Sequence, residues 1–306
     1  MSELFAQSID ARTRYCAVYG YPVKHSASPA MQNAGLAVLG LNWRYVAFEV
    51  HPDNLRAALN GAKVMGFVGL NLTVPHKVLA VDMVDCLDSS ARAWGAVNTV
   101  VFEGRSKDGA WRPLREFTEL PRELRSCGFN TDAEAITRAI EEDLQVQLRG
   151  AKVVLLGAGG AGRTAALRLA AEQVSELCLV NRTMAKAAAV AEEIRTRHPG
   201  VKLTIGYPGG SVELLVNATS LGLKPEDPSP LDQNLFPVHR AGAVYDMIYR
   251  PAETPLLKSA RAAGCRTANG IGMLLYQGAK ALELWTGQPA PVSAMRQALE
   301  KNVYAA

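Results

Sequence analysis

Three glycines, at positions 157, 159 and 162, have the spacing of a phosphate-binding turn. They follow an apolar run, residues 153–156, and precede a helix-forming run, residues 163–172. In a dinucleotide-binding fold the first glycine permits the sharp turn, the second lets the backbone approach a pyrophosphate, and the third lets the helix pack on the strand. The N–H groups at the helix start then face the phosphates. The spacing predicts a dinucleotide site that comprises Gly157, Ala158, Gly159, Gly160, Ala161 and Gly162.

The end of the next predicted strand, residues 177–180, indicates which dinucleotide binds. Folds that prefer NAD usually have Asp or Glu about 20 residues after the glycine turn, where the carboxylate binds the ribose 2′-hydroxyl. Here Asn181, Arg182 and Thr183 follow the strand, and none of them is acidic. Arg182, with Lys186 one helical turn beyond it, suits a 2′-phosphate, so we expect NADP(H). The alternative is a solvated Arg182 and a Thr183 that only caps the next helix.

Lys77 lies just past the end of a predicted strand, and Asp132 lies far from it in the sequence. A hydride transfer to a carbonyl needs a proton donor near the oxygen that gains charge, and a lysine held by a carboxylate can meet this need. Open α/β sheets bind ligands at the carboxyl ends of their strands, which favours such a role. The alternatives are a solvated lysine at a helix start and an aspartate that caps a helix.

Short polar side chains near the predicted strand ends can form hydrogen bonds with a polar substrate. They are Ser26, Ser28, Asn71, Thr73 and Asn98. Each is also an ordinary turn residue, and Ser28, which precedes a proline, is typical of a helix cap. No cysteine or carboxylate accompanies a histidine at ligand spacing, so we expect no metal.

Strands alternate with helices along the chain, which indicates an α/β fold. The 306 residues suffice for two domains. We expect a discontinuous substrate-binding domain, residues 1–132 and 270–306, and a Rossmann-type NADP-binding domain, residues 133–269. The C-terminal helices are expected to return to the first domain, with a ligand cleft between the two domains.

Three segments carry further structural expectations. Residues 78–87 are expected to form a helix, and so are residues 133–148 after a polar cap. Residues 103–127 interrupt the alternation, because their first eleven residues are polar and hold two glycines and a proline. We expect a surface excursion there, with a short helix near residues 121–126.

Composition excludes several classes of protein. With 48% hydrophobic and 20% charged residues, the chain is expected to be globular. A net charge of +4 without a basic run suits anionic small ligands and argues against nucleic acid. No apolar run has membrane-spanning length, and the N-terminus does not resemble a signal peptide. Five scattered cysteines without a CxxC pair predict reduced thiols in a cytoplasmic protein. Monomer and homodimer both stay open.

Several stretches, in this order, resemble the motifs of the shikimate dehydrogenase family. The resemblance spans residues 15–300, and its motifs are residues 20–29, 71–77, 95–99, 130–132, 157–162, 181–183, 217–220, 245–249 and 270–274, with Gln277. Three features depart from the family pattern. Asn269 stands where we expect an aspartate, Ala133 stands where a glycine is common, and residues 103–127 are longer than the usual hairpin.

The resemblance implies a reversible, NADP-linked reduction of 3-dehydroshikimate to shikimate, a step of aromatic amino acid biosynthesis. Lys77 and Asp132 would be the acid–base pair, and Ser26 and Ser28 would hold the substrate carboxylate. The other implied substrate ligands are Asn71, Thr73, Asn98, Tyr249 and Gln277, with Asp132 also binding a ring hydroxyl. The implied cofactor contacts are the glycine turn, Asn181, Arg182, Thr183, Lys186, Thr219, Met247 and Gly270.

Three other functions compete with this one. The first is a paralogue that acts on quinate or an aminoshikimate with the same groups. The second is an NADPH-binding sensor without turnover, which the presence of Lys77 and Asp132 disfavours. The third is a methylenetetrahydrofolate-type dehydrogenase, which the paired serines and Gln277 disfavour.

Overall fold

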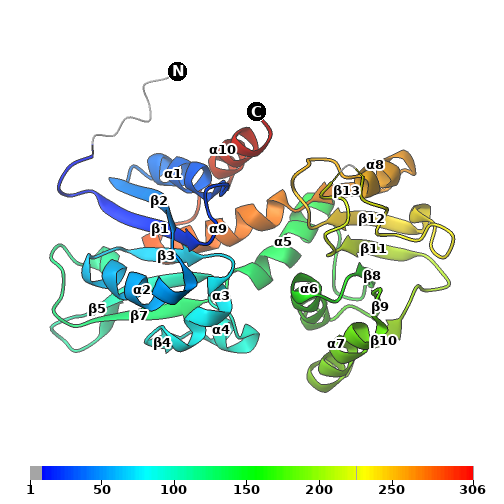
Figure 1. Ribbon diagram of the computed structural model, residues 1–306, viewed down its shortest axis with the longest axis horizontal. Coiled ribbons are helices and arrows are strands. Elements are labelled where there is room, and N and C mark those ends of the chain that lie inside the picture. Colours follow the sequence, from blue (N-terminus) through cyan, green and yellow to red (C-terminus); the bar gives the residue numbers. More distant parts are fainter. Residues whose placement is uncertain (1–8, 225, 306) are drawn as a thin grey trace. The chain divides into compact units, whose positions relative to one another are not determined.

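The computed structural model describes residues 9–224 and 226–305, which form two compact units (Figure 1). Unit 1 comprises the chain up to Asp132 and from Gln277 onward, and unit 2 comprises Ala133–Tyr276. Residues 270–276, which the sequence prediction placed in the first domain, lie in unit 2. Both units combine a sheet with helices, so the predicted two-domain α/β fold is confirmed.

The described residues of unit 1 form a mixed seven-stranded sheet with the order β2-β1-β3-β5-β7-β4, and β6 pairs with β5. Strands β1, β2 and β3 are parallel, whereas β5 runs antiparallel to β3 and β7. The strands are β1 (Arg14–Gly20), β2 (Trp43–Glu49), β3 (Gly69–Leu72), β4 (Cys86–Leu87), β5 (Thr99–Arg105), β6 (Trp111–Pro113) and β7 (Leu124–Phe129).

Helices from both ends of the chain pack in unit 1. They are α1 (Ser28–Val38), α2 (Leu55–Val64), α3 (His76–Leu79), α4 (Ser89–Trp94), the second half of α9 (Ile271–Thr286) and α10 (Val292–Tyr304). Helix α10 packs on α1. Trp285 of α9 is fully buried, and its Nε1 donates to Val100 O of β5 at 3.0 Å. A Cβ added at Gly69 would lie 2.0 Å from that Nε1, so only glycine fits at this position of β3.

The helix predicted over residues 78–87 is wrong. Helix α3 ends at Leu79, a 3₁₀ turn covers Ala80–Asp82, and Cys86–Leu87 form the short strand β4. Strand β4 pairs in parallel with β7, Cys86 opposite Cys127. This long-range pairing overrides a local apolar pattern that also suits a helix.

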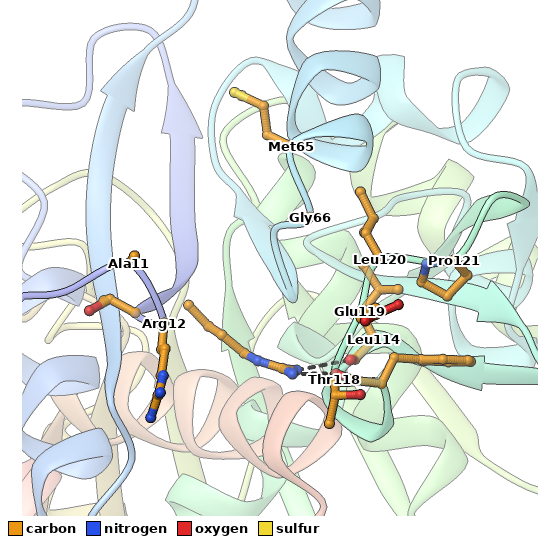
Figure 2. A pocket seen from close by; sticks show the side chains of 12 residues that line it. Ala11, Arg12, Met65, Gly66, Leu114, Thr118, Glu119, Leu120 and Pro121 are labelled. Carbon is orange, nitrogen blue, oxygen red and sulfur yellow. Dashed lines mark hydrogen bonds between the residues drawn. The ribbon is translucent and has the colours of Figure 1, made fainter.

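Parts of the excursion predicted over residues 103–127 belong to the sheet. They are the end of β5, the strand β6 and the start of β7, and the helix expected near residues 121–126 is wrong because β7 begins at Leu124. Arg14 of β1 donates to the carbonyls of Leu114, at 2.9 Å, and Phe117. Arg14, Leu114 and Phe117 help to line a cavity of about 640 Å³. Arg12, Met65 and Leu120 also line this cavity, and none of the predicted site residues does (Figure 2).

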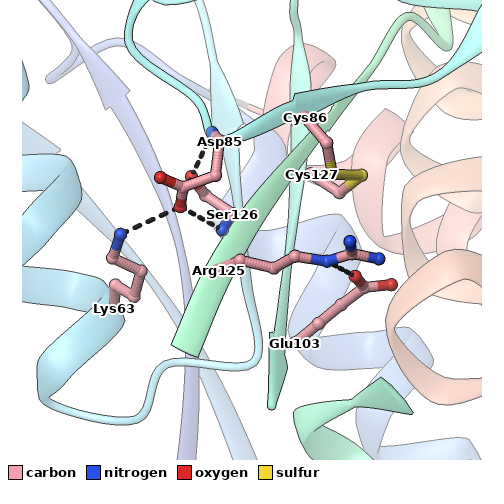
Figure 3. Close-up of a disulfide and its surroundings, with 7 residues drawn as sticks. All are labelled: Lys63, Asp85, Cys86, Glu103, Arg125, Ser126 and Cys127. Carbon is pink, nitrogen blue, oxygen red and sulfur yellow. Dashed lines mark hydrogen bonds and ion pairs between the residues drawn. A yellow bond between two sulfur atoms is a disulfide. The ribbon is translucent and has the colours of Figure 1, made fainter. Parts of the chain in front are cut away.

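The expectation of five reduced thiols is wrong in this structure for one pair. Cys86 and Cys127 form a disulfide across the β4–β7 pair, at a sequence separation of 41 residues (Figure 3). Cys16, Cys178 and Cys265 are free. Cysteine spacing did not reveal the bridge, because strand pairing and not sequence proximity brings the two sulfurs together.

Unit 2 has the Rossmann arrangement. Its described residues form a parallel six-stranded sheet of order β10-β9-β8-β11-β12-β13, which is 3-2-1-4-5-6 in the unit's own numbering. The strands are β8 (Lys152–Leu156), β9 (Glu176–Val180), β10 (Lys202–Ile205), β11 (Val212–Asn217), β12 (Ala241–Asp246) and β13 (Arg266–Asn269). The helices are α5 (Asp132–Leu144), α6 (Gly160–Ala171), α7 (Met184–Arg197), α8 (Pro255–Ala262) and the first half of α9.

Among the described residues, no helix is both long and apolar enough to span a membrane.

Candidate active site

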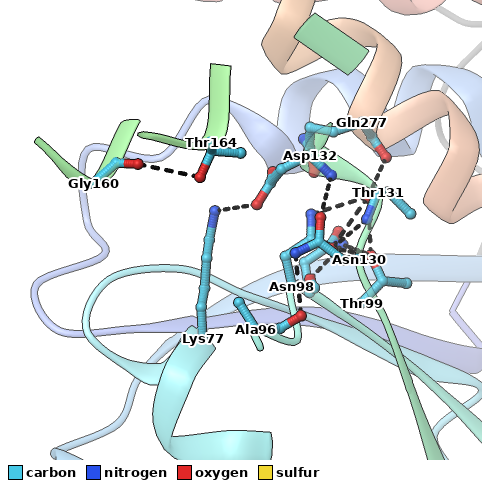
Figure 4. A network of polar contacts seen from close by, with 11 residues as sticks. Lys77, Ala96, Asn98, Thr99, Asn130, Thr131, Asp132, Gly160, Thr164 and Gln277 are labelled. Carbon is cyan, nitrogen blue, oxygen red and sulfur yellow. Dashed lines mark hydrogen bonds and ion pairs between the residues drawn. The ribbon is translucent and has the colours of Figure 1, made fainter. Parts of the chain in front are cut away.

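The structure brings Lys77 and Asp132 into direct contact, although 55 residues separate them (Figure 4). Lys77 Nζ donates to Asp132 Oδ2 at 2.7 Å, and the exposed fractions of the two side chains are 32% and 15%. Lys77 is therefore not a freely solvated lysine. The side chain stays partly exposed, so Nζ can give a proton to an oxygen on a bound ligand while the carboxylate holds it in place.

Hydrogen bonds from neighbouring residues of unit 1 hold the backbone at Lys77 and Asp132. Val97 N–H donates to Lys77 O at 2.8 Å, and Asp132 N–H donates to Asn130 Oδ1 at 3.1 Å. The Asn130 side chain in turn donates to Ala96 O at 3.1 Å. The segment between α4 and β5 is thus tied both to the lysine and to the start of α5.

A buried polar network lies behind the pair. Thr131 N–H donates to Asn98 Oδ1 at 2.7 Å, and Asn98 Nδ2 donates to Thr131 Oγ1 at 2.9 Å. Thr131 Oγ1 lies 3.1 Å from Gln277 O and 3.2 Å from Thr99 Oγ1. Because the groups are buried and mutually bonded, the residue before Asp132 has little freedom to move. Thr99 and Thr131 were not among the predicted site residues, although Thr131 lies inside the Asn-Thr-Asp motif.

Asn71 is part of the same framework. Its Nδ2 donates to Asn98 O at 3.2 Å and to Thr99 Oγ1 at 3.1 Å, and its Oδ1 accepts from Tyr45 Oη at 2.8 Å. Burial raises the pKa of the Tyr45 phenol well above its usual range, so this hydroxyl stays protonated and remains a donor. Both amide hydrogens of Asn71 are already used, which makes it a support for the site as much as a ligand.

The two predicted serines lie at the start of α1. Ala27 and not Ser28 is the residue that precedes the helix, and no side chain caps it, so the expected capping role of Ser28 is wrong. The buried Ser28 hydroxyl lies against Tyr45, and Ser28 N–H donates to the half-buried Ser26 at Oγ, 3.3 Å away. Thr73 follows β3 and is half-buried. The Ser26 and Ser28 hydroxyls thus each have a partner within unit 1, and a ligand would bind them in addition to that partner.

The remaining predicted substrate residues divide between the units. Gln277 is nearly buried on α9 and belongs to unit 1. Tyr249 follows β12, is half-buried and belongs to unit 2.

The glycine turn of unit 2 has the stereochemistry that its spacing predicts. Gly157 has φ +104°, which favours glycine, and its N–H donates to Val180 O at 2.8 Å. A Cβ at Gly162 would lie 2.2 Å from Gly157 O, whereas a Cβ at Gly159 or Gly160 would meet no atom within 4 Å. Helix α6 begins at Gly160, so its first N–H groups adjoin open space that an anionic phosphate group can occupy.

The end of β9 carries the predicted selectivity residues. Asn181 Oδ1 accepts from Ala158 N–H at 3.0 Å, which joins this strand end to the glycine turn. Arg182 and Lys186 are exposed, and within the described part of the chain neither forms an ion pair. Thr183 precedes α7 but makes no side-chain capping bond, contrary to the expectation. Two cations and a hydroxyl are therefore available to a 2′-phosphate.

The neighbouring strand ends form a second polar cluster, built on Asn217 and Asp246, which lie in motifs 217–220 and 245–249 but were not among the predicted site residues. Asn217 at the end of β11 donates to Asp246 Oδ1 of β12 at 3.0 Å and accepts from the Thr219 hydroxyl at 2.7 Å. Burial raises the pKa of Asp246, while bonds from Thr254, Ile248 N–H and Asn217 oppose this rise. The cluster fixes the loops that carry the remaining predicted cofactor residues: Thr219, Met247 and Gly270.

Comparisons with known proteins agree with this geometry. Family models match residues 18–100 as the shikimate dehydrogenase substrate binding domain, residues 139–204 as shikimate / quinate 5-dehydrogenase, and residues 270–300 as the shikimate 5'-dehydrogenase C-terminal domain. The shikimate dehydrogenase (NADP(+)) of Methanopyrus kandleri is 42% identical over 304 residues, which cover 97% of this chain and 98% of the relative.

The chain belongs to the shikimate dehydrogenase family. A shikimate dehydrogenase solved in complex with NADP+ has a TM-score of 0.80 and 34% identity, and covers 97% of this chain and 98% of its own. The enzyme from Thermus thermophilus, solved with NADP(H) and shikimate, has a TM-score of 0.76 and 36% identity, with 94% and 99% covered. Like its relatives in this family, the chain is an NADP-dependent oxidoreductase.

Membership of the shikimate dehydrogenase family explains why so many predicted residues fall in two places. The residues of motifs 71–77, 95–99 and 130–132 meet in one network of unit 1, and those of motifs 157–162 and 181–183 meet at one edge of the unit 2 sheet. Tyr45, Asn217 and Asp246 support these groups, and nothing local in the sequence marks Tyr45 for that role.

Proposed function

We propose that this enzyme catalyses the reversible reduction of 3-dehydroshikimate to shikimate with NADPH. The observation that carries the proposal is the 2.7 Å contact between Lys77 and Asp132, in the unit whose residues 18–100 match the shikimate dehydrogenase substrate binding domain. A partly exposed lysine side chain, held by a mostly buried aspartate, is suited to protonate a ketone oxygen.

The residues of unit 2 fit NADP(H). The open space at Gly159 and Gly160 suits the pyrophosphate, and Arg182 and Lys186 suit the 2′-phosphate. When bound, NADPH supplies the hydride that reduces the substrate carbonyl carbon. Lys77 Nζ then gives a proton to the carbonyl oxygen as charge develops, and takes it back from the alcohol in the reverse reaction. Asp132 keeps Nζ in position during both steps.

Substrate orientation is assigned to hydroxyl and amide groups. The Ser26 and Ser28 hydroxyls are proposed to bind the carboxylate. The ring hydroxyls are proposed to be bound by Asn71, Thr73, Asn98, Asp132, Tyr249 and Gln277. Buried, hydrogen-bonded donors such as Asn98 lose little entropy on binding, so they favour substrates with hydroxyls at matching positions.

A substrate and cofactor panel tests the proposal. Initial rates on shikimate and on quinate are measured with NADP+ and with NAD+, by following the absorbance of the reduced cofactor. We expect the highest kcat/KM for shikimate with NADP+. A higher kcat/KM for quinate would favour the quinate paralogue. NADPH binding without turnover on any of these substrates would support the silent sensor and overturn the enzyme assignment.

Cofactor preference is tested with Arg182→Ala. Loss of one charge-assisted contact is expected to cost about 1.5–3 kcal/mol, or roughly 10- to 150-fold in KM for NADP+. The KM for NAD+ should stay near the wild-type value because NAD+ lacks the 2′-phosphate. Arg195→Ala is a matched control, since Arg195, on α7, is also an exposed arginine but pairs with Glu192 at 2.9 Å. Equal losses for both cofactors would contradict the proposed role of Arg182.

We further propose that the enzyme works in the cytoplasm, as a monomer or a homodimer. The three free cysteines, Cys16, Cys178 and Cys265, support this location, because unpaired thiols are typical of a reducing compartment. Light scattering after size-exclusion chromatography distinguishes the two oligomeric states.

A further inference from the structure

Three side chains of types that can ligate a metal lie together in unit 1, outside the active-site network. One donor atom from each of Cys86, Glu103 and Cys127 lies within 4.8 Å of the others, and all three residues are half-buried (Figure 3). Glu103 and Cys127 are the first and last residues of the 103–127 segment that departs from the family pattern. The long hairpin therefore supplies two of the three donors.

Strand register explains why these side chains share one face of the sheet. Cys86 pairs with Cys127 across β4 and β7, and Glu103 pairs with Arg125 across β5 and β7. Residues two apart on a strand point to the same face, so Arg125 and Cys127 project together, and Glu103 lies diagonally opposite Cys127. The cluster is thus built into the sheet and does not depend on a mobile loop.

The opposite face of the same strands is held independently of the two sulfurs. Asp85 N–H lies 3.0 Å from Ser126 O, and Asp85 Oδ2 accepts from Ser126 N–H at 2.7 Å and from Ser126 Oγ at 2.8 Å. Lys63 of α2 pairs with the same carboxylate at 2.9 Å. These bonds keep β4 beside β7 when the disulfide is open, so the two thiols stay close to each other.

We infer that the reduced Cys86–Cys127 pair, together with Glu103, binds one thiophilic divalent cation, with Zn²⁺ as the best match. Zinc accepts thiolate sulfur at about 2.3 Å and carboxylate oxygen at about 2.0–2.2 Å, and sites with three protein ligands take a water as the fourth. Two sulfurs and one oxygen, in a half-buried position that water can reach, meet this requirement. The disulfide is the state of the same pair that excludes the metal.

Local charge is compatible with this assignment. Two thiolates and one carboxylate around a divalent cation leave one net negative charge. Arg125 Nε donates to Glu103 Oε2 at 2.6 Å, and its guanidinium lies 4.6 Å from the centre of the Trp111 ring. In the described part of the chain Glu103 Oε1 has no hydrogen-bond partner, so this oxygen can bind the cation. Arg125 then orients the carboxylate, and its positive charge offsets the net negative charge of the metal site.

Conversion of the disulfide into the metal-binding form balances in electrons and protons. A dithiol or phosphine reductant donates two electrons and is itself oxidised, the Cys86–Cys127 S–S bond breaks, and two protons complete the two thiols. Metal binding then releases those two protons, because the ligands are thiolates. Thiol-reducing compartments therefore favour the metal-binding form.

Cobalt and zinc titrations of the full chain test the proposal. The protein is reduced with a phosphine, freed of reductant and titrated with Co²⁺, and Zn²⁺ is added last. Reduced wild type should bind one Co²⁺ with a near-ultraviolet thiolate charge-transfer band that Zn²⁺ abolishes. The oxidised protein, which contains the same residues, should show no such band. A reduced protein without the band, or an oxidised protein with it, would overturn the proposal.

Variants assign the ligands. Cys127→Ser should abolish the band, whereas Cys265→Ser, which removes a half-buried free thiol of unit 2, should leave it unchanged. Glu103→Gln should keep the band and weaken Zn²⁺ binding at least about tenfold in a chelator competition. If Cys127→Ser fails to fold, Glu103→Gln and the comparison of oxidised with reduced wild type still decide the outcome. Unchanged Zn²⁺ affinity in Glu103→Gln would remove Glu103 from the site and refute the three-ligand assignment.

Discussion

Replacing Lys77 by methionine removes the proposed proton donor and keeps most of the apolar stem of the side chain. Replacing Asp132 by asparagine keeps the shape of its partner and removes only the charge. The 2.7 Å contact and the 15% exposure of Asp132 indicate that the carboxylate acts directly on Nζ. The two variants and their combination form a double-mutant cycle on a single contact.

The size of each effect follows from the role of the group. Positioned proton transfer contributes about 10²- to 10⁴-fold, so Lys77→Met should lower kcat by that factor, or about 2.7–5.4 kcal/mol of activation free energy. Asp132→Asn should cost less than Lys77→Met, because an amide oxygen can still accept from Nζ. If the two residues act as one unit, the double variant should lose about as much as Lys77→Met alone.

Steady-state kcat on shikimate, NADPH binding by fluorescence and circular dichroism of each variant provide the readouts. NADPH binding should not change, since both residues lie in unit 1 and the predicted cofactor turn lies in unit 2. Lys63→Met is the matched control, because Lys63 also pairs with an aspartate of unit 1, Asp85, at 2.9 Å. Near-wild-type kcat in Lys77→Met, or losses that multiply in the double variant, would refute the reasoning.

Three further predictions concern the fold around the sites. Gly162→Ala should weaken NADPH binding at least about tenfold in a fluorescence titration, because its Cβ would lie 2.2 Å from a backbone oxygen of the turn. The control Gly209→Ala should bind NADPH as the wild type does, because a Cβ at that position meets no atom within 4 Å. Gly69→Ala should lower the free energy of unfolding by about 3 kcal/mol in urea, since its Cβ would lie 2.0 Å from Trp285 Nε1; an unchanged midpoint would contradict this packing. Burial lowers the pKa of His76 below its ordinary value of 6.5, so the folded state binds fewer protons than the unfolded state. The free energy of unfolding should therefore decrease as pH drops below about 6.5. His76→Phe should make this decrease shallower, and an equally steep decrease in the variant would assign the pH dependence to other groups.

Much of the fold could be predicted from local patterns. The apolar run before Gly157 and the helix after it predicted the first strand and helix of the Rossmann sheet, and both are present. Arg182 and the absence of an acid beside it were equally visible. The failures were segments whose structure depends on distant partners. Residues 78–87 looked helical on their own, and the short strand Cys86–Leu87 exists only because β7 lies beside it.

The active site shows the same division. Lys77 and Asp132 could be named from residue type and motif, but each also had an ordinary explanation in a turn or a cap. The supporting role of Tyr45 had no local signal, because it depends on a hydrogen bond to Asn71, 26 positions away. Asp246 lies in motif 245–249, but its bond to Asn217, 29 positions away, was not visible in the sequence. Ser28 was expected to cap a helix, and the helix begins one residue earlier than that role requires.

The sequence by itself determined the class of fold, the nucleotide-binding turn and the set of residue types available for chemistry. These depend on interactions over a few residues: strand alternation, helix periodicity, glycine stereochemistry and charge. The tertiary structure decided which of those residues act together. It joined Lys77 to Asp132, bonded Asn98 to Thr131, and placed Cys86, Glu103 and Cys127 on one face of a sheet. Such contacts form only when strands far apart in the chain pair, and the free energy of that pairing comes from burial and backbone hydrogen bonds that no single stretch of sequence displays.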